Sequence, residues 1–211
     1  MKCQICEVRK PRRHCPGVHG DICAQCCGAE REVTVDCPLD CEYLLESRLH
    51  QRPPEEGADT PFPNRDVNVT EQFLRDHEPL VIFLSAELLS TTLSTAGAID
   101  SDVREALEAS IRTYRTLQSG LIYETKPANL LAMNIQTGLQ AAVDKLRQKL
   151  SEKGAAGIRD LDILGVLVFL QRLELTHNNG RKRGRAFVHF LRTNFPPLRP
   201  TEDEPASLIQ V

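Results

Sequence analysis

Eight cysteines lie between positions 3 and 41 of this 211-residue chain, and none lies beyond them. Two pairs, Cys3/Cys6 and Cys23/Cys26, each contain a gap of two residues. Such a gap lets a tight turn point both sulfurs at one metal ion, with backbone amides donating to the thiolates, and two pairs complete a tetrahedral site. The spacing therefore predicts that these four cysteines bind one ion.

The remaining cysteines can form a second four-sulfur site, made of Cys15, Cys27, Cys37 and Cys41. The ligands would then alternate along the chain between two ions, as in a cross-braced finger. Adjacent side chains diverge, so one of Cys26 and Cys27 would serve each ion, and the sequence leaves open which serves which. His14 and His19 are alternative ligands, because the three-residue gap between Cys15 and His19 resembles the spacing of metal ligands.

Zinc fits this cysteine set better than three alternatives. A disulfide framework needs an oxidising compartment, and the first residues lack the apolar core of a secretory signal. The cysteine run typical of iron–sulfur clusters is missing, and a redox pair at Cys23 and Cys26 would leave the other cysteines unexplained. We predict two zinc ions with a structural role, because eight thiolates fill two tetrahedral sites and leave no position for a catalytic water.

The composition, with 41% apolar and 26% charged residues, is typical of a globular protein. The absence of Trp and an aromatic content of 5% favour helices packed by Leu, Ile and Ala. The longest apolar stretch, Ile163–Leu170, is far shorter than a membrane span. We therefore expect no membrane segment, and clustered cysteines without an export signal indicate a cytoplasmic protein.

Prolines and acidic residues mark a boundary between two domains. Residues 50–66 contain four prolines, two glutamates and a glycine between positions 53 and 63, which predicts a solvated spacer. We expect a zinc-binding module at residues 1–49, an all-helical domain at 67–197 and an acidic tail at 198–211. The predicted fold class is mainly α: a small N-terminal cross-braced zinc-binding module followed by a five- or six-helix bundle.

Apolar spacing typical of helices recurs throughout the larger domain. A short segment begins at Thr70 and is interrupted by Pro79, and residues 80–90 form a buried helix or, as the less favoured alternative, a core strand. A start that resembles a capping box, at Asp102 and Glu105, opens a helix to about residue 124. Further helices are predicted over residues 131–150, over 158–175, and around Phe187, Phe190 and Leu191 before Pro196-Pro197.

Positive charge is concentrated near the end of the helical domain. Residues 172–199 carry seven basic residues and one acidic residue, although the whole chain has a net charge of −3. Guanidinium groups on a loop that leads into a helix suit phosphate, on nucleic acid or on another anion; the alternative is a solvated face neutralised by acidic neighbours. The candidate binding residues are Arg181, Lys182, Arg183, Arg185, His189 and Arg192. A second basic cluster, at positions 9–13, lies between metal ligands.

Two stretches of the sequence resemble a group of uncharacterised bacterial proteins with a cysteine-rich, zinc-binding N-terminus. They are Cys23-Ala-Gln-Cys26-Cys27-Gly28-Ala-Glu-Arg31 and Cys37-Pro38-Leu-Asp40-Cys41-Glu-Tyr43-Leu44. Residues 119–124 and 179–187 resemble the same group, which implies similarity over most of the chain but no known activity. The ligand pattern is also similar to cross-braced zinc fingers of the MYND, HIT and RING kinds. It differs from these fingers in ligand spacing and in being nearly all cysteine.

The sequence lacks the motifs that mark common enzyme classes, such as a glycine-rich phosphate loop, a G-x-S-x-G elbow or an H-E-x-x-H pair. We therefore expect a non-enzymatic, zinc-stabilised interaction protein whose helical domain binds a protein partner. The alternative is a nucleic-acid-binding regulator that uses residues 181–192, and an enzyme of unknown class comes third.

Overall fold

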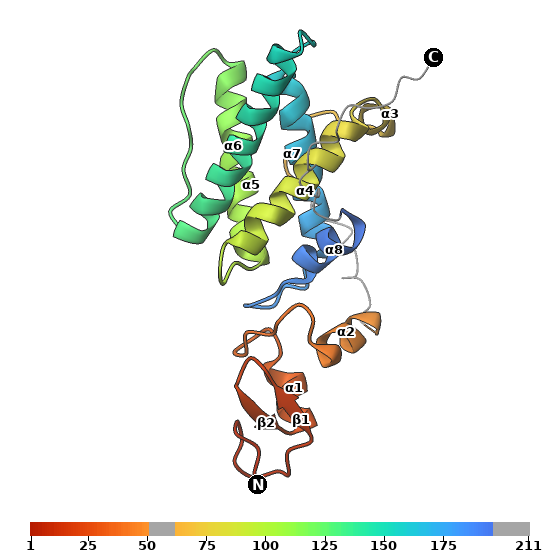
Figure 1. The fold of residues 1–211 in the computed structure, drawn as a ribbon, viewed down its shortest axis with the longest axis vertical. Coiled ribbons are helices and arrows are strands. Elements are labelled where there is room, and N and C mark those ends of the chain that lie inside the picture. The colour runs from red at the N-terminus through yellow and green to blue at the C-terminus, as the bar shows by residue number, and fades with distance from the viewer. Residues whose placement is uncertain (51–61, 196–211) are drawn as a thin grey trace, which may run out of the picture.

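A computed structural model describes residues 1–50 and 62–195 of the chain. The described residues form a small N-terminal module and a larger helical bundle, which follow one another along the long axis of the molecule (Figure 1). The mainly α fold predicted from the sequence is confirmed, since the described residues contain eight helices and a sheet of only two short strands.

The N-terminal module combines one short hairpin with two short helices. Strands β1 (Arg13–Cys15) and β2 (Gly20–Ile22) pair antiparallel, with Arg13 opposite Ile22 and Cys15 opposite Gly20. Helices α1 (Ala24–Glu30) and α2 (Glu42–Leu49) follow. Apart from cysteine, the buried apolar side chains of the module are Ile22, Val35 and Leu44. So small a core cannot hold about 50 residues in one fold, which makes the cysteines the main candidates for its stabilisation.

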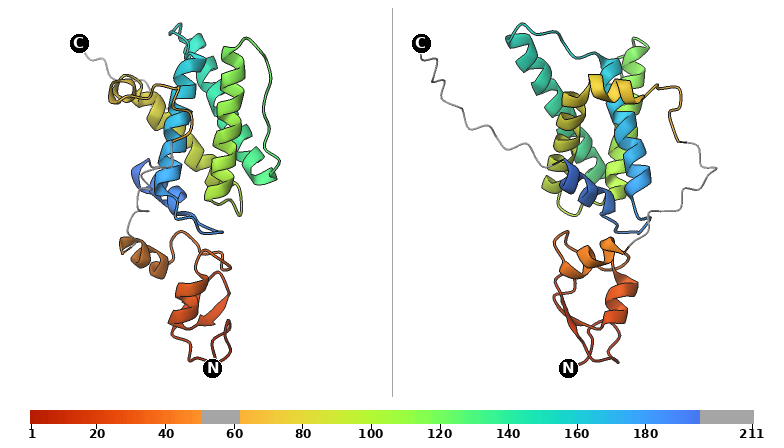
Figure 2. Two further views of the ribbon diagram at one scale, coloured as in Figure 1. Left: turned by 180° about the vertical axis from the view of Figure 1, so that it is seen from behind. Right: turned by 90° about the vertical axis from the view of Figure 1, so that its right-hand side faces the viewer.

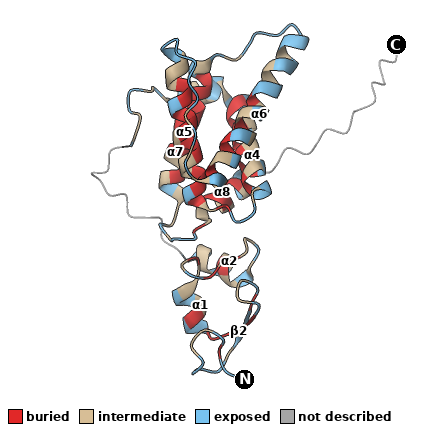
Figure 3. Ribbon diagram, turned by 90° about the vertical axis from the view of Figure 1, so that its left-hand side faces the viewer, coloured by how far each residue is buried: buried red, intermediate tan, exposed pale blue. Residues whose placement is uncertain are grey.

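The bundle contains six helices within residues 62–195. They are α3 (Glu71–Asp76), α4 (Glu78–Ser94), α5 (Asp100–Gln118), α6 (Leu130–Glu152), α7 (Asp160–His177) and α8 (Ala186–Asn194). Helix α5 packs against α6 and α7, and α4 packs against α6, α7 and α8. Buried residues line the inner faces of these helices, while their outer faces are exposed (Figure 3). None of the helices in the described ranges has the length and apolar character that a membrane span requires.

The helical segment that begins at Thr70 is interrupted next to Pro79, as predicted, because α3 ends at Asp76 and α4 begins at Glu78. Pro79 occupies the first turn of α4, where a missing N–H group removes no intrahelical hydrogen bond. The region from Leu80 to Ser90 is therefore helical rather than a strand. Helix α3 packs beside it, and Phe73 of α3 lies against Gly165 of α7, where an added Cβ atom would collide with the phenyl ring.

Helix α5 differs from its predicted bounds at both ends. Its N-cap is Ile99, and Asp102 lies in the first turn, where its carboxylate accepts the backbone N–H of Ile99 at 2.9 Å. Glu105 instead accepts the backbone N–H groups of Ala128 and Asn129, just before α6. The helix ends at Gln118 rather than near residue 124, because Gly120 has a φ of 75° and turns the chain out of the helix.

The end of the predicted spacer is attached to the bundle. Arg115 of α5 donates to Asp66 and to Asn64, and Asn64 donates to Gln171 of α7 at 2.8 Å. The folded surface of the bundle therefore begins a few residues before the predicted start at 67. Residues 51–61 of the spacer lie outside the described residues, as do Pro196-Pro197 and the acidic tail at 198–211.

The module and the bundle meet at the end of the bundle that carries α8. The views of Figure 2 agree that α2 and the turn before it face α8 and the loop that precedes it. Residues far apart in sequence lie in contact there, and Leu39 of the module packs against the core of the bundle. The two predicted units are therefore docked on each other rather than connected only through a spacer.

Candidate metal centre

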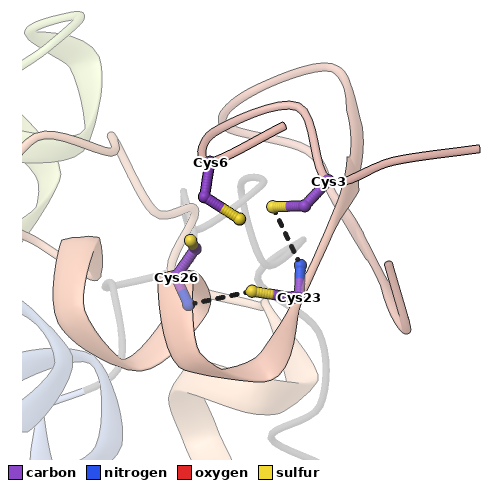
Figure 4. Close-up of side chains that lie close together, drawn as sticks. All are labelled: Cys3, Cys6, Cys23 and Cys26. Atoms are coloured by element: carbon purple, nitrogen blue, oxygen red, sulfur yellow. Dashed lines mark hydrogen bonds between the residues drawn. The ribbon is translucent and has the colours of Figure 1, made fainter. Parts of the chain in front are cut away.

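Four cysteine sulfurs gather at one point in the N-terminal module. The Sγ atoms of Cys3, Cys6, Cys23 and Cys26 all lie within 4.8 Å of one another. Figure 4 shows these side chains converging from two turns of the chain onto a common space. Cys3, Cys23 and Cys26 are buried, and Cys6 is half-buried. This set, which matches the two predicted pairs, is a four-sulfur group that could hold a metal ion.

The backbone places both pairs of this set. Cys3 and Cys6 flank a turn in which the N–H of Glu7 donates to the carbonyl of Cys3 at 2.8 Å. Cys23 is the N-cap of α1, and Cys26 lies in the first turn of that helix. Two backbone amides point at sulfurs: the N–H of Cys23 donates to Sγ of Cys3 at 3.2 Å, and the N–H of Cys26 to Sγ of Cys23 at 3.4 Å. These bonds stabilise thiolates, which are the form of cysteine that binds metal.

The four thiols of this group cannot all ionise without a compensating charge. Burial raises the pKa of Cys3, but backbone N–H groups of Cys6, Cys23 and Ile5 outweigh it and lower the pKa to about 6. Contact with Cys23 and burial raise the pKa of Cys26 to about 12. A negative charge on one sulfur thus disfavours a second one beside it. A divalent cation would remove this conflict and bind all four as thiolates.

The second predicted set of cysteines lines one pocket, to which none of the first set contributes. Cys15, Cys27, Cys37 and Cys41 all border this pocket, which is also lined by Arg13, Arg31, Tyr43 and Leu44. Among the described residues, the first set is the only group of three or more Cys, His, Asp or Glu ligand atoms that all lie within 4.8 Å of one another. The sulfurs of the predicted second set are therefore more widely spaced than those of the first. The structure also separates the adjacent cysteines, because Cys26 belongs to the first set and Cys27 lines the second pocket.

Arginine side chains surround the sulfur of Cys27. Arg13 donates to its Sγ at 3.4 Å, and Arg31 donates at 3.8 Å. The guanidinium of Arg13 also lies 4.3 Å from the centre of the Tyr43 ring, which fixes its position. Burial raises the pKa of Cys37 in the same pocket. These cations would offset the excess negative charge of a metal ion bound by four thiolates.

The two histidines proposed as alternative ligands lie apart from the first set of sulfurs. Nδ1 of His14, on β1, lies 3.2 Å from a carboxylate oxygen of Asp21 on β2, and His14 also borders the second pocket. His19 is exposed in the turn between the strands and has a φ of 54°.

Two arginines of the predicted anion-binding segment contact the N-terminal module. Arg181 donates to the backbone carbonyl of Arg31. The side chain of Arg185 donates to the carbonyls of Ala98 and Cys37, and its Nη1 lies 2.7 Å from a carboxylate oxygen of Asp36. These guanidinium groups therefore have protein partners in the folded chain.

The other four residues of this segment differ in exposure. Arg192 donates to the carbonyl of Leu39 at 3.0 Å. Lys182 and Arg183 have exposed side chains. His189 is partly buried, and its pKa is lowered by burial and by the nearby charges of Arg48 and Arg192. Of the six candidates, Lys182 and Arg183 are therefore the basic side chains that remain open to an external phosphate.

Glu32 is the residue of this region that sequence reasoning missed. Its side chain is wholly buried, and its carboxylate accepts from Arg48 at 2.9 Å, from Asn179 at 2.7 Å and from the backbone N–H of Arg185 at 3.0 Å. Its backbone carbonyl accepts from the N–H of Arg183 at 2.8 Å. The sequence Arg31-Glu32-Val33 carries no signal for this role, because the partners lie more than 140 residues away, except for Arg48.

Comparison of the chain with protein-family models, with curated proteins and with solved structures gives no match in any of the three. The resemblance to bacterial proteins with a cysteine-rich N-terminus therefore stays a prediction.

Proposed function

We propose that the chain is a non-enzymatic, zinc-stabilised interaction protein of the cytoplasm. Its N-terminal module would hold two structural zinc ions, and its helical domain would bind a protein partner. The observation that carries the proposal is the convergence of Cys3, Cys6, Cys23 and Cys26 within 4.8 Å. A set of four thiolates favours zinc and would fill its tetrahedral coordination sphere.

The second ion is supported by the pocket that Cys15, Cys27, Cys37 and Cys41 share. The cations around Cys27 provide the charge that a second four-thiolate site requires. Binding of this ion would require the four side chains to bring their sulfurs together, to a common zinc–sulfur distance of about 2.3 Å. Alternation of the two ligand sets along the chain would then cross-link every segment of a module that has little apolar core.

A protein partner is supported by apolar side chains in the connection between α5 and α6. Leu121, Ile122 and Tyr123 are consecutive, and 62%, 97% and 66% of their surfaces are exposed. A run of three exposed apolar residues is typical of a binding surface. The nucleic-acid alternative receives less support, because Arg181, Arg185 and Arg192 already bind the N-terminal module.

Affinity capture with the zinc-loaded full chain tests the partner. The triple variant Leu121→Ser, Ile122→Ser, Tyr123→Ser should lose a protein that the native chain retains, because the apolar contact is removed. The matched control is Leu161→Ser, which alters a leucine that is 54% exposed on α7. Equal capture by both variants would contradict the proposed surface. Salt-sensitive recovery of nucleic acid that depends on Lys182 and Arg183 would favour the alternative.

A further inference from the structure

One loop of the N-terminal module makes most of the contacts with the bundle, and it runs between proposed metal ligands. We name residues 31–39 the docking loop; it follows Cys27, contains Cys37 and ends just before Cys41. All three of these cysteines border the second pocket. The shape of the docking loop is therefore tied to the positions of the cysteines proposed to bind the second ion.

The docking loop supplies most of the polar contacts that the module makes with the bundle. Backbone carbonyls of Arg31, Glu32, Cys37 and Leu39 each accept a hydrogen bond from the bundle, and so does the carboxylate of Glu32. The carboxylate of Asp36 forms an ion pair with Arg185. The donors are Arg181, the N–H of Arg183, Arg185 and Arg192, together with Asn179. From outside the loop, Arg48 of α2 donates to the carbonyl of Arg185 at 3.1 Å.

Main-chain carbonyls accept these bonds only while the loop keeps one backbone conformation. Glu32 has a φ of 52°, in the left-handed region that non-glycine residues rarely adopt. Its carboxylate is wholly buried, and a buried carboxylate is unfavourable unless it keeps its hydrogen bonds and its charged partner. The conformation of the loop at Glu32 therefore depends on contacts with Arg48, Asn179 and the amide of Arg185.

The hairpin that carries Cys15 also supports the loop. Gly17 lies so close to the backbone carbonyl of Asp36 and to the side chain of Val35 that an added Cβ atom would collide with both. A metal ion shared by Cys15, Cys27, Cys37 and Cys41 would stabilise this contact between the hairpin and the loop. It would join the hairpin to both sides of the loop.

From this arrangement we infer that metal binding by Cys15, Cys27, Cys37 and Cys41 and docking of the module on the bundle are energetically coupled. The inference rests on the second ion of the proposed function. Metal at this set holds the docking loop in the conformation that binds Arg183, Arg185 and Arg192. By linkage, docking raises the affinity of the set for metal by the same factor. The site thus acts as a metal-sensitive latch between the two parts of the chain.

The first set of cysteines provides an internal comparison. Among the described residues, no hydrogen bond joins residues 1–30 to the bundle. The N-terminus, which Cys3 and Cys6 closely follow in sequence, lies at the end of the module remote from α8 (Figure 1). Metal bound there should respond weakly to docking.

Hydrogen exchange on the full chain tests the first half of the inference. The amides of Arg183 and Arg185 belong to the bundle but donate to Glu32, so their protection reports docking directly. In Cys37→Ser, Cys41→Ser these amides should exchange roughly tenfold faster or more, with the helices α4–α7 still protected. Cys3→Ser, Cys6→Ser should leave them slow. Equal loss of protection in both double variants would overturn a latch specific to the second set.

Native mass spectrometry of the same samples separates the inference from the proposed function. If Cys37→Ser, Cys41→Ser binds one zinc ion fewer than the native chain and the two amides stay protected, the latch is contradicted while the second site stands. If this variant and the native chain bind the same number of ions, the second site itself fails, and the latch fails with it.

Variants that weaken docking test the second half of the inference, that docking raises the affinity of the second set for metal. Glu32→Gln removes the negative charge that pairs with Arg48. Asn179→Ala removes one hydrogen-bond donor to the Glu32 carboxylate; because Asn179 belongs to the bundle, this change leaves the sequence of the module intact. Both should weaken the second zinc ion roughly tenfold in a competition with a chromophoric chelator, and leave the first unchanged. Glu46→Gln, at an exposed position of α2, is the matched control. Unchanged affinity for both ions in both variants would contradict the coupling.

Discussion

The backbone N–H of Arg185 donates a hydrogen bond of 3.0 Å to the carboxylate of Glu32, across 153 residues of sequence. The side chain of the same arginine pairs with Asp36 and with the carbonyl of Cys37. One residue of the basic segment thus binds the docking loop at three points. Much of the positive charge in this segment faces an acidic loop of the same chain.

Replacement of Arg185 should therefore lower the stability of the folded chain. Arg185→Ala removes an ion pair with Asp36 that is largely buried on the arginine side, and it leaves the carbonyls of Ala98 and Cys37 without this donor. We expect a loss of about 2 kcal/mol, or roughly 4–8 °C in melting temperature for a chain of this length. Lys182→Ala, three positions away and exposed, should stay within about 0.5 kcal/mol of the native value. Thermal unfolding followed by circular dichroism measures both, and equal melting temperatures would contradict the docking role.

A second ion pair stabilises the interior of the bundle. Arg104 on α5 donates twice to Glu174 on α7, at 2.7 and 2.8 Å, and Glu174 is wholly buried. Arg104→Ala would leave this carboxylate buried without a charged partner. Because Arg104 itself is about one-third exposed, we expect a loss of about 2–3 kcal/mol in denaturant unfolding.

Arg112→Ala is the control for this change. Arg112 lies on the same helix, and its guanidinium is 4.0 Å from Glu108 at an exposed position. Its loss should cost less than about 0.5 kcal/mol. If both variants unfold at the same denaturant concentration, the buried pair does not stabilise the bundle as described.

Ionisation of Asp100 should make the stability of the bundle depend on pH. Burial raises the pKa of Asp100 to about 7, although the backbone N–H groups of Phe187 and Val188 donate to its carboxylate and oppose the shift. An unfolded aspartate ionises near pH 4. Between these values the folded chain binds more protons than the unfolded chain, so the free energy of unfolding should fall as pH rises from about 4 to 7.

Carboxyl carbon chemical shifts in the full chain measure this pKa directly. Asp100→Asn cannot ionise and keeps one oxygen acceptor, so the part of the pH slope due to Asp100 should disappear in this variant. An Asp100 carboxyl group that is already ionised at pH 5 would contradict the expected direction.

The cation beside Cys27 should affect metal affinity. Arg13→Gln removes the donor to Sγ of Cys27 while Tyr43 and the hairpin remain. We expect the second zinc ion to bind roughly 10- to 100-fold more weakly, the usual effect of losing an outer-shell partner. Arg12→Gln is the matched control, since Arg12 is exposed and adjacent. Chelator competition should give the native affinity for this control; a loss of affinity equal to that of Arg13→Gln would point to net charge rather than the contact.

The helices were predictable because their apolar spacing is local information. The stripe from Leu131 to Leu150 lies on α6, where Ile135 and Leu139 are buried and the other members are half-buried. Helix ends were less predictable, because Asp102 and Glu105 form a convincing start in sequence although the chain enters the helix at Asp100. The side chain of Glu105 is used instead by the turn before α6, a contact that no local pattern indicates.

The first set of cysteines, which could hold a metal ion, was predictable for a similar reason. Cys3/Cys6 and Cys23/Cys26 have a spacing that one tight turn satisfies, so sequence distance predicts spatial distance. Which of Cys26 and Cys27 joins this set depends on the direction of α1, which the structure provides. The partners of the basic segment were not predictable, because Arg185 and Glu32 come together only when two separately patterned domains dock.

The metal content of the full chain, purified without added metal, tests the central claim most directly. Elemental analysis combined with a native mass spectrum gives both the identity and the number of bound ions. With Cys3, Cys6, Cys23 and Cys26 as one site and Cys15, Cys27, Cys37 and Cys41 as the other, we predict two zinc ions per chain. A single ion per chain, or iron accompanied by visible absorbance, would contradict the two-zinc account.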